Sequence, residues 1–139
     1  MVARTKAGLK ALRERVGLSQ QDLAAMLGVN VRSVKRWEHE GQPWEAPDGA
    51  WERLEVELDA QREVVAGIMD RAVKSGASMA VIDYYRDQAM MDECGEKSIP
   101  YGRANAAAMA AAELLESAGI EVEFRYPSES RESRESRQP

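Results

Sequence analysis

The chain of 139 residues has little of what covalent crosslinks, metal sites and membranes require. It contains one cysteine and one histidine, so it cannot form an internal disulfide, and His39 has no second Cys or His at a metal-ligand spacing. No apolar run reaches the length that spans a bilayer, and the first ten residues, MVARTKAGLK, lack the hydrophobic segment of a signal peptide. We therefore expect a cytoplasmic protein with no cofactor, no structural metal and no membrane contact.

Sequence signatures of catalysis are also missing. There is no glycine-rich phosphate loop, no G-x-S-x-G and no Cys/His pair. The carboxylates fall at helical surface spacing, and Cys94 follows Asp92 and Glu93, which disfavour a reactive thiolate. We therefore expect that the protein is not an enzyme.

Charge is distributed unevenly along the chain, whose total is −5. Residues 1–36 carry eight Lys/Arg and two acidic residues, a net charge of +6. Residues 37–75 sum to −6 and residues 76–126 to −5, while the remainder is balanced. A polyanion would be attracted to the first segment and repelled by the others, with an affinity that falls as salt rises. A solvated basic face is the alternative interpretation.

The stretch from Leu18 to Glu38, LSQQDLAAMLGVNVRSVKRWE, predicts two short helices joined by a tight turn. Ser19 and Asp22 form a helix start in which each side chain satisfies a backbone donor. Gly28 permits the turn, and Asn30 can cap the second helix. Two helices joined by three or four residues fit the helix-turn-helix plan.

Eight residues of this stretch resemble the Xre/Cro-CI family of helix-turn-helix proteins in order and spacing, within a likeness that covers roughly the first 55 residues. They are Gln20, Leu23, Ala24, Gly28, Val29, Val34, Trp37 and Glu38. Ala24 is small where the helices cross, and Gly28 must turn. The apolar spacing of Lys6 to Val16 predicts a preceding helix. The resemblance implies that Arg13 on that helix pairs with Glu38, and that the ligand is double-stranded DNA.

The second helix of the motif would enter the DNA major groove and bring its first two turns to the base edges. The predicted base-reading residues are Val31, Arg32, Lys35 and Arg36. Arg32 and Arg36 share a helical face because they are four residues apart, and each guanidinium can donate two hydrogen bonds to a guanine. Ser33 is short enough for a phosphate contact. Gln20, at the positive start of the first helix, is similar to the family's phosphate-binding residue.

After Glu38 the sequence departs from the family pattern. Residues 39–48, HEGQPWEAPD, include three acidic residues and no Lys or Arg, whereas many relatives carry a basic loop here. We therefore expect no second phosphate contact on this side. Trp44, which lies between two prolines, could fill the core, lie on a sugar-phosphate edge or cover a partner, and we predict the core.

A long helix is predicted from Gly49 to about Lys74, because this stretch contains no proline and only Gly67 as an internal weak point. Its apolar residues keep a spacing of three and four, with Gln61 in the same row, and they are Trp51, Leu54, Leu58, Val65, Ile68 and Ala72. Such a stripe is typical of a coiled-coil dimer seam and equally of a core helix within one chain. The sequence leaves both open.

The remaining residues predict a small α/β unit. Residues 79–85 form a β-prone apolar run, residues 86–93 a short helix and residues 101–118 an alanine-rich helix. Residues 120–126 alternate apolar and charged side chains, as a half-buried strand does. Two strands joined by helix make a βαβ-like unit that is too small to be stable alone, so we expect a second copy of the chain to complete it. The residues predicted to form the dimer contact are Leu58, Val65, Ile68, Ile120, Val122 and Phe124.

The predicted fold class is mainly α with a small α/β C-terminal part. The expected segments are a helix-turn-helix DNA-binding domain (residues 1–47), a long linking helix (48–75), an α/β dimerisation domain (76–126) and a disordered tail of Ser, Glu and Arg (127–139). This layout also resembles a smaller group of phage and plasmid regulators, including those found beside anti-CRISPR genes, through Tyr84, Tyr85 and the pair Ala111 and Ala112.

These features favour a homodimeric transcription regulator that represses its own promoter at a pseudo-palindromic operator. A competing hypothesis is an antitoxin or other protein-interaction module, in which the acidic C-terminal half neutralises a basic partner protein and DNA binding is retained for autoregulation. RNA binding through the same basic surface is a third hypothesis, although the chain lacks the aromatic stacking platform that is common in single-strand readers.

Overall fold

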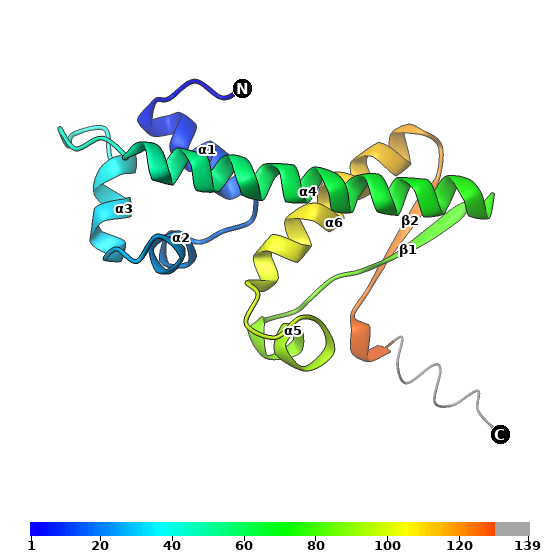
Figure 1. The fold of residues 1–139 in the computed structure, drawn as a ribbon. Coiled ribbons are helices and arrows are strands. Elements are labelled where there is room, and N and C mark those ends of the chain that lie inside the picture. The colour runs from blue at the N-terminus through cyan, green and yellow to red at the C-terminus, as the bar shows by residue number, and fades with distance from the viewer. Residues whose placement is uncertain (130–139) are drawn as a thin grey trace. The chain divides into compact units, whose positions relative to one another are not determined.

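The computed structural model describes residues 1–129, so the predicted disorder of the tail falls largely on residues 130–139, outside the described part. The elements in chain order are α1 (Lys6–Arg15), α2 (Gln20–Leu27), α3 (Val31–Glu38), α4 (Asp48–Ser75), β1 (Met79–Asp83), α5 (Gln88–Cys94), α6 (Tyr101–Ser117) and β2 (Glu121–Arg125) (Figure 1). The predicted fold class, mainly helical with a small C-terminal α/β part, is confirmed. The chain divides into two compact units, residues 1–61 and the residues from 62 onward, so the long helix α4 contributes to both.

The first unit has a core of large aliphatic side chains from α1, α2, α3 and the first half of α4. The buried residues are Leu9, Leu12, Val16, Leu18, Leu23, Ala24, Val34, Trp51, Leu54 and Leu58. Thr5, Ser19 and Asn30 begin the first three helices, and each side chain accepts a hydrogen bond from a backbone N–H of the first turn. Gly28 ends α2 with a φ of 67°, a left-handed conformation that glycine adopts without steric cost.

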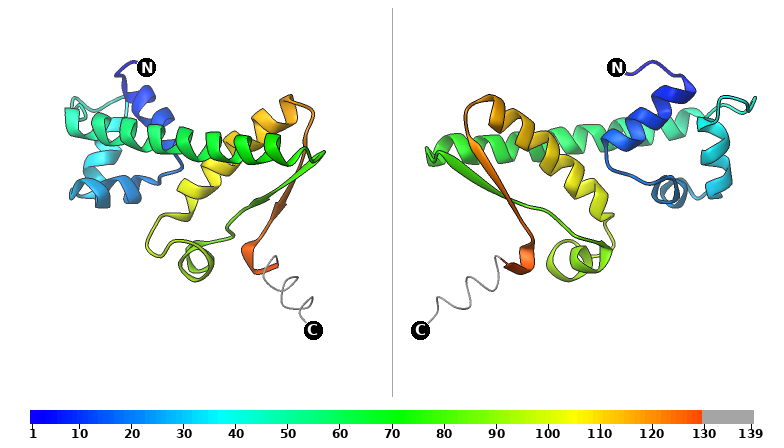
Figure 2. Two further views of the ribbon diagram at one scale, coloured as in Figure 1. Left: turned by 45° about the vertical axis from the view of Figure 1, so that its right-hand side comes forward. Right: turned by 180° about the vertical axis from the view of Figure 1, so that it is seen from behind.

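The second unit contains a βαβ arrangement in which the connection between two parallel strands includes α5 and α6. Met79 pairs with Glu121 and Asp83 with Arg125 in the register of β1 and β2. One face of this sheet packs against α6 and the second half of α4 (Figure 2). The buried residues of this core are Val65, Ile82, Ala108, Ala111, Ala112 and Leu115. The alanines of α6 allow its backbone to approach the sheet closely.

The apolar stripe of α4 is divided between the two cores. Leu58 is buried in the first core and Val65 in the second, and Ile68 is half-buried beside Val65. Gln61 lies between them and donates a 2.8 Å hydrogen bond from Nε2 to the carbonyl of Arg15. This corrects the prediction that Leu58 and Val65 form a dimer contact, because their side chains are already removed from solvent within one chain.

Strand β1 ends at Asp83, two residues earlier than the apolar run predicted. The main chain of Tyr85 is bonded to a side chain instead of a strand: Asn105 Oδ1 accepts from Tyr85 N–H, and Asn105 Nδ2 donates to Tyr85 O, each at 2.8 Å. Ile120, directly before β2, and Val122 on β2 are half-buried as the alternation predicted, whereas Phe124 is exposed and its ring meets that of Tyr84 edge to face.

Within residues 1–129, no helix is both long and apolar enough to cross a membrane. The same residues contain no group of three His, Cys, Asp or Glu side chains that could hold a metal ion.

Candidate nucleic-acid interface

Helix α3 is held by one buried residue and two half-buried ones. Val34 is completely buried, and Val31 and Trp37 pack against the first core from the same side of the helix. Asn30 Oδ1 accepts a 2.9 Å hydrogen bond from the backbone N–H of Arg32, which fixes the start of α3 directly after the Gly28 turn. These contacts determine which face of α3 is left for a ligand.

The exposed face of α3 carries its three basic residues, Arg32, Lys35 and Arg36. Arg32 and Arg36 are one helical turn apart, so their guanidinium groups leave the helix in the same direction. Ser33 is half-buried beside this face. Val31, which the sequence also predicted to read bases, uses its side chain at least partly for core packing, so its reach toward a base is smaller than that of the two arginines.

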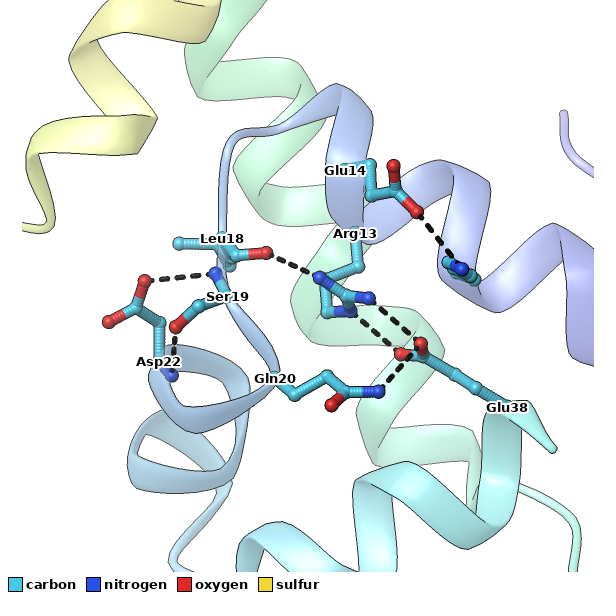
Figure 3. Close-up of polar contacts among 8 residues, drawn as sticks. Arg13, Glu14, Leu18, Ser19, Gln20, Asp22 and Glu38 are labelled. Atoms are coloured by element: carbon cyan, nitrogen blue, oxygen red, sulfur yellow. Dashed lines mark hydrogen bonds and ion pairs between the residues drawn. The ribbon is translucent and has the colours of Figure 1, made fainter.

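A buried ion pair fixes the end of α3 to α1. Arg13 Nε donates to Glu38 Oε2 at 2.7 Å and Arg13 Nη2 to Glu38 Oε1 at 2.8 Å, with side chains that are 8% and 4% exposed (Figure 3). The third guanidinium nitrogen, Nη1, donates to the carbonyl of Leu18 at 2.9 Å. This two-point geometry is the one that resists rotation best, because both nitrogens bind one planar carboxylate.

Arg13 remains charged in this environment. Its hydrogen bonds to Glu38 raise the pKa of Arg13 and outweigh the opposing effect of burial, and the charge of Glu38 adds to the rise. Every buried polar side-chain atom among the described residues has a hydrogen-bond partner, so the pair leaves no buried donor or acceptor unsatisfied there.

Gln20 joins this network at the start of α2. Its Nε2 donates to Glu38 Oε1 at 3.2 Å (Figure 3), and its side chain is half-buried. An amide nitrogen has two N–H groups, so one remains for a second acceptor. The predicted phosphate contact of Gln20 therefore stays a prediction, and its observed contact is with the ion pair.

Lys6 is a structural residue of this site that sequence reasoning missed. Its Nζ donates to the carbonyls of Arg36, Trp37 and Trp44 at 3.1, 3.2 and 2.5 Å. The first two carbonyls belong to the last turn of α3, where a positive charge is favoured by the helix dipole. No local signal indicates this role, because Lys6 and Arg36 are thirty residues apart in the sequence.

Half of the basic residues in residues 1–36 are engaged within the first unit. Arg4 binds Asp48 at 2.7 Å and lies over the Trp51 ring, and Lys10 is 3.9 Å from Glu14. Together with Lys6 and Arg13 they are four of the eight. No side-chain hydrogen bond or ion pair within residues 1–129 engages the other four, which are Arg15, Arg32, Lys35 and Arg36. Three of these four lie on α3, so the unpaired positive charge is concentrated on the predicted recognition helix.

Trp44 lies outside the core, contrary to our prediction. Its side chain is 57% exposed, while Trp51 is buried and Trp37 half-buried. The main chain of Trp44 is held by Lys6, whose Nζ donates to the Trp44 carbonyl.

Residues 9–43 match the helix-turn-helix family. This segment is an Xre/Cro-like helix-turn-helix domain. The match begins within α1 and ends before Trp44, and it supports a DNA-binding regulator. No curated protein matches the chain. The helix-turn-helix domain therefore contains the ion pair, the cap of α3 and all three exposed basic residues of α3.

Proposed function

We propose that the protein is a sequence-specific transcription regulator that binds double-stranded DNA as a homodimer and represses its own promoter. The observation that carries the proposal is that Arg32 and Arg36 lie on the exposed face of α3 and have no side-chain hydrogen bond or ion pair within residues 1–129. Arginines in this position can donate two hydrogen bonds each to guanine O6 and N7. The Arg13–Glu38 pair and the hydrogen bonds of Lys6 support the proposal because both fix the C-terminal end of α3 to α1.

Homodimerisation is supported by the second unit, whose sheet has only two strands. Two copies of the chain would present two α3 helices to half-sites about one helical turn, or ~34 Å, apart. Repression follows from occupancy: a dimer that covers its own promoter excludes the polymerase. The proposal assigns the chain a binding role and no catalytic step.

The test is a fluorescence-anisotropy titration of the protein against DNA from its own upstream region and against a scrambled control, at two salt concentrations. We expect tight binding to the upstream DNA alone, with an affinity that falls as salt rises. Arg32→Ala and Arg36→Ala should each remove sequence preference, at a cost of about 1–3 kcal/mol on the cognate site. Gln20→Ala should weaken binding to both DNAs about equally.

One control variant and two outcomes separate this proposal from its competitors. Arg15→Ala removes an equally exposed basic residue that lies outside α3, so it should leave the preference between the two DNAs unchanged. Unchanged preference in both α3 arginine variants would defeat the assignment of base readers. Equal or absent binding of the wild-type protein to the two DNAs would favour the protein-interaction hypothesis instead.

A further inference from the structure

The two strands of the second unit have different free edges. Glu121 N–H donates to Ser78 O at 3.0 Å, and Tyr84 N–H donates to Arg125 O at 2.8 Å. In a parallel pair the main-chain groups of successive residues point alternately toward and away from the neighbouring strand. The two bonds show that the main-chain groups of Ser78 and Tyr84 point toward β2. The alternate residues of β1 therefore direct their N–H and C=O groups away from β2, and these residues are Met79, Val81 and Asp83.

The outward edge of β1 has no partner within the described residues. No hydrogen bond there reaches the main chain of Met79, Val81 or Asp83, and all three residues are exposed. The edge carries no Lys and no Pro, which are the residues that commonly protect an edge strand from pairing. Ala80 and Ile82, which alternate with them, point to the covered face and pack with α4 and α6.

We infer that β1 is the edge by which two copies of the chain pair, antiparallel and about a two-fold axis at Val81. This inference rests on the proposed homodimer and specifies its interface. Pairing across Val81 brings Met79 opposite Asp83 of the second copy, so all three outward residues meet outward residues. The result is a four-stranded sheet in the order β2-β1-β1-β2, a size at which sheets become stable.

Charge favours the β1 edge over the β2 edge. In the β1 pairing the only charged residue of the strand, Asp83, faces an uncharged methionine. The same full overlap of two β2 strands would place Glu123 directly opposite Glu123 of the other copy, and like charges at opposed positions destabilise a strand pair. A shift of two residues is the smallest that preserves the faces of the sheet, and it leaves only three of the five strand residues paired in either direction. In one direction it places Glu121 opposite Glu123, and in the other it places Glu123 opposite Arg125.

Symmetry excludes the mixed alternative for a closed dimer. Pairing of β1 with β2 of another copy leaves one free β1 and one free β2, so a third copy can add, and the assembly grows as an open fibre. The two-fold β1 pairing uses the same edge on both copies and closes. It also keeps the helices of both copies on one face of the common sheet, because a two-fold axis perpendicular to a sheet does not exchange its faces.

Sedimentation velocity over a range of micromolar concentrations tests the inference with Val81→Lys. Val81 is in register with Glu123 of the same chain, so an ammonium group there has a favourable neighbour and the fold should be retained, as circular dichroism can verify. The dimer, however, would hold two ammonium groups opposite each other at its axis. We expect the dissociation constant of the dimer to rise on the order of 10-fold, from the lost Val81 contact and the added repulsion. Val64→Lys is the matched control, since Val64 is 51% exposed and Val81 48%, and it should remain dimeric.

A crosslinking experiment gives an answer even where the lysine variant fails to fold. A hydrogen-bonded antiparallel pair separates Cα atoms by about 5.5 Å, inside the roughly 4.4–6.8 Å range of disulfides. Val81→Cys in a Cys94→Ser background should therefore form a covalent dimer on mild oxidation, and Val64→Cys in the same background should not. Equal crosslinking of both variants, or none with Val81→Cys, would overturn the β1 interface.

The outcomes distinguish this inference from the proposed function. A wild-type dimer that survives Val81→Lys overturns the β1 edge and leaves the homodimeric regulator standing. A wild-type protein that is monomeric at every concentration overturns both the homodimer and its interface. Anisotropy with the upstream DNA still tests DNA binding by the helix-turn-helix domain separately. Support requires that Val81→Lys weakens binding to the upstream DNA only through loss of the dimer, with the preference for that DNA over the scrambled control retained.

Discussion

The two units of the chain differ in the size of the side chains that fill their cores. Among residues 1–129, the seven largest side chains that are fully buried include six from the first unit and only Leu115 from the second. The second unit fills its core mainly with alanines of α6 and leaves Met79, Val81, Met109 and Leu114 exposed. The core of the first unit is therefore filled by its own large side chains, whereas the second has an apolar strand and its main-chain edge left to bury.

The exposed surfaces differ in the same sense. What the first unit presents on α3 is unpaired positive charge, which suits a polyanion. What the second unit presents on β1 is unpaired backbone with two apolar side chains, which suits another strand. The difference indicates that specificity for DNA and assembly of the protein are encoded in separate parts of the chain, so that each can be altered without the other.

The largest loss of unfolding free energy is expected from a substitution in the first unit. Arg13→Ala removes one partner of the buried pair and strands the Glu38 carboxylate, which should cost about 3–5 kcal/mol of unfolding free energy in a urea titration. The double variant Arg13→Met, Glu38→Leu removes both charges and should recover most of that loss. A single variant within about 1 kcal/mol of the wild type would show that the pair is solvated rather than buried.

Leu115→Ala tests whether the second unit is the weaker one. Among the residues of this unit that the structure describes, Leu115 is the only large side chain that is fully buried, and the cavity should cost about 2–4 kcal/mol. All three tryptophans, Trp37, Trp44 and Trp51, lie in the first unit, so their fluorescence reports that unit and far-UV circular dichroism reports both. We expect the dichroism transition to begin at lower urea while the fluorescence transition moves little.

Leu23→Ala is the matched control, since Leu23 is fully buried in the first unit. Leu23→Ala should lower the urea midpoint of the fluorescence transition by about as much as Leu115→Ala lowers the onset of the dichroism transition. A Leu115→Ala protein whose two transitions stay coincident would mean that the units unfold together through the shared helix α4.

Sequence signals were sufficient where structure is determined locally. The bounds of α2 and α3 follow from the Ser19 and Asp22 start, the Gly28 turn and the Asn30 cap, all of which act within a few residues. The stripe of α4 is also periodic, but period alone does not tell a core from a dimer seam. The structure assigns Leu58 and Val65 to two different cores, a division that no repeat in the sequence indicates.

Contacts between distant residues account for what the sequence could not predict. Asn105 ends β1 by binding the main chain of Tyr85, twenty residues away. In the sequence, Lys6 counts as one of the eight basic residues of residues 1–36, yet its ammonium group donates to carbonyls of α3 and of the loop that follows it. Composition therefore overestimates the charge that is available to DNA, because it does not reveal which cations are already engaged.

Lys6→Met measures how much the hydrogen bonds from Lys6 to the end of α3 contribute to stability. Loss of the ammonium group leaves the last carbonyls of α3 without their donor and should cost about 1 kcal/mol in thermal or urea unfolding. Lys10→Met is the matched control on the same helix, because Lys10 is exposed and only 3.9 Å from Glu14, and it should cost less than about 0.5 kcal/mol. Equal effects of the two substitutions would indicate that Lys6 acts only through net charge.

The smallest effect is expected at Trp44. Because its side chain is exposed, Trp44→Ala should change the unfolding free energy by less than about 0.5 kcal/mol, as most surface substitutions do. Trp51→Ala, at a buried position of the same unit, should cost about 3–5 kcal/mol. Acrylamide should quench the wild-type fluorescence more strongly than that of Trp44→Ala, since the substitution removes the most accessible indole. A Trp44→Ala protein destabilised as much as Trp51→Ala would place the ring back in the core and reopen the first of the three roles considered for it.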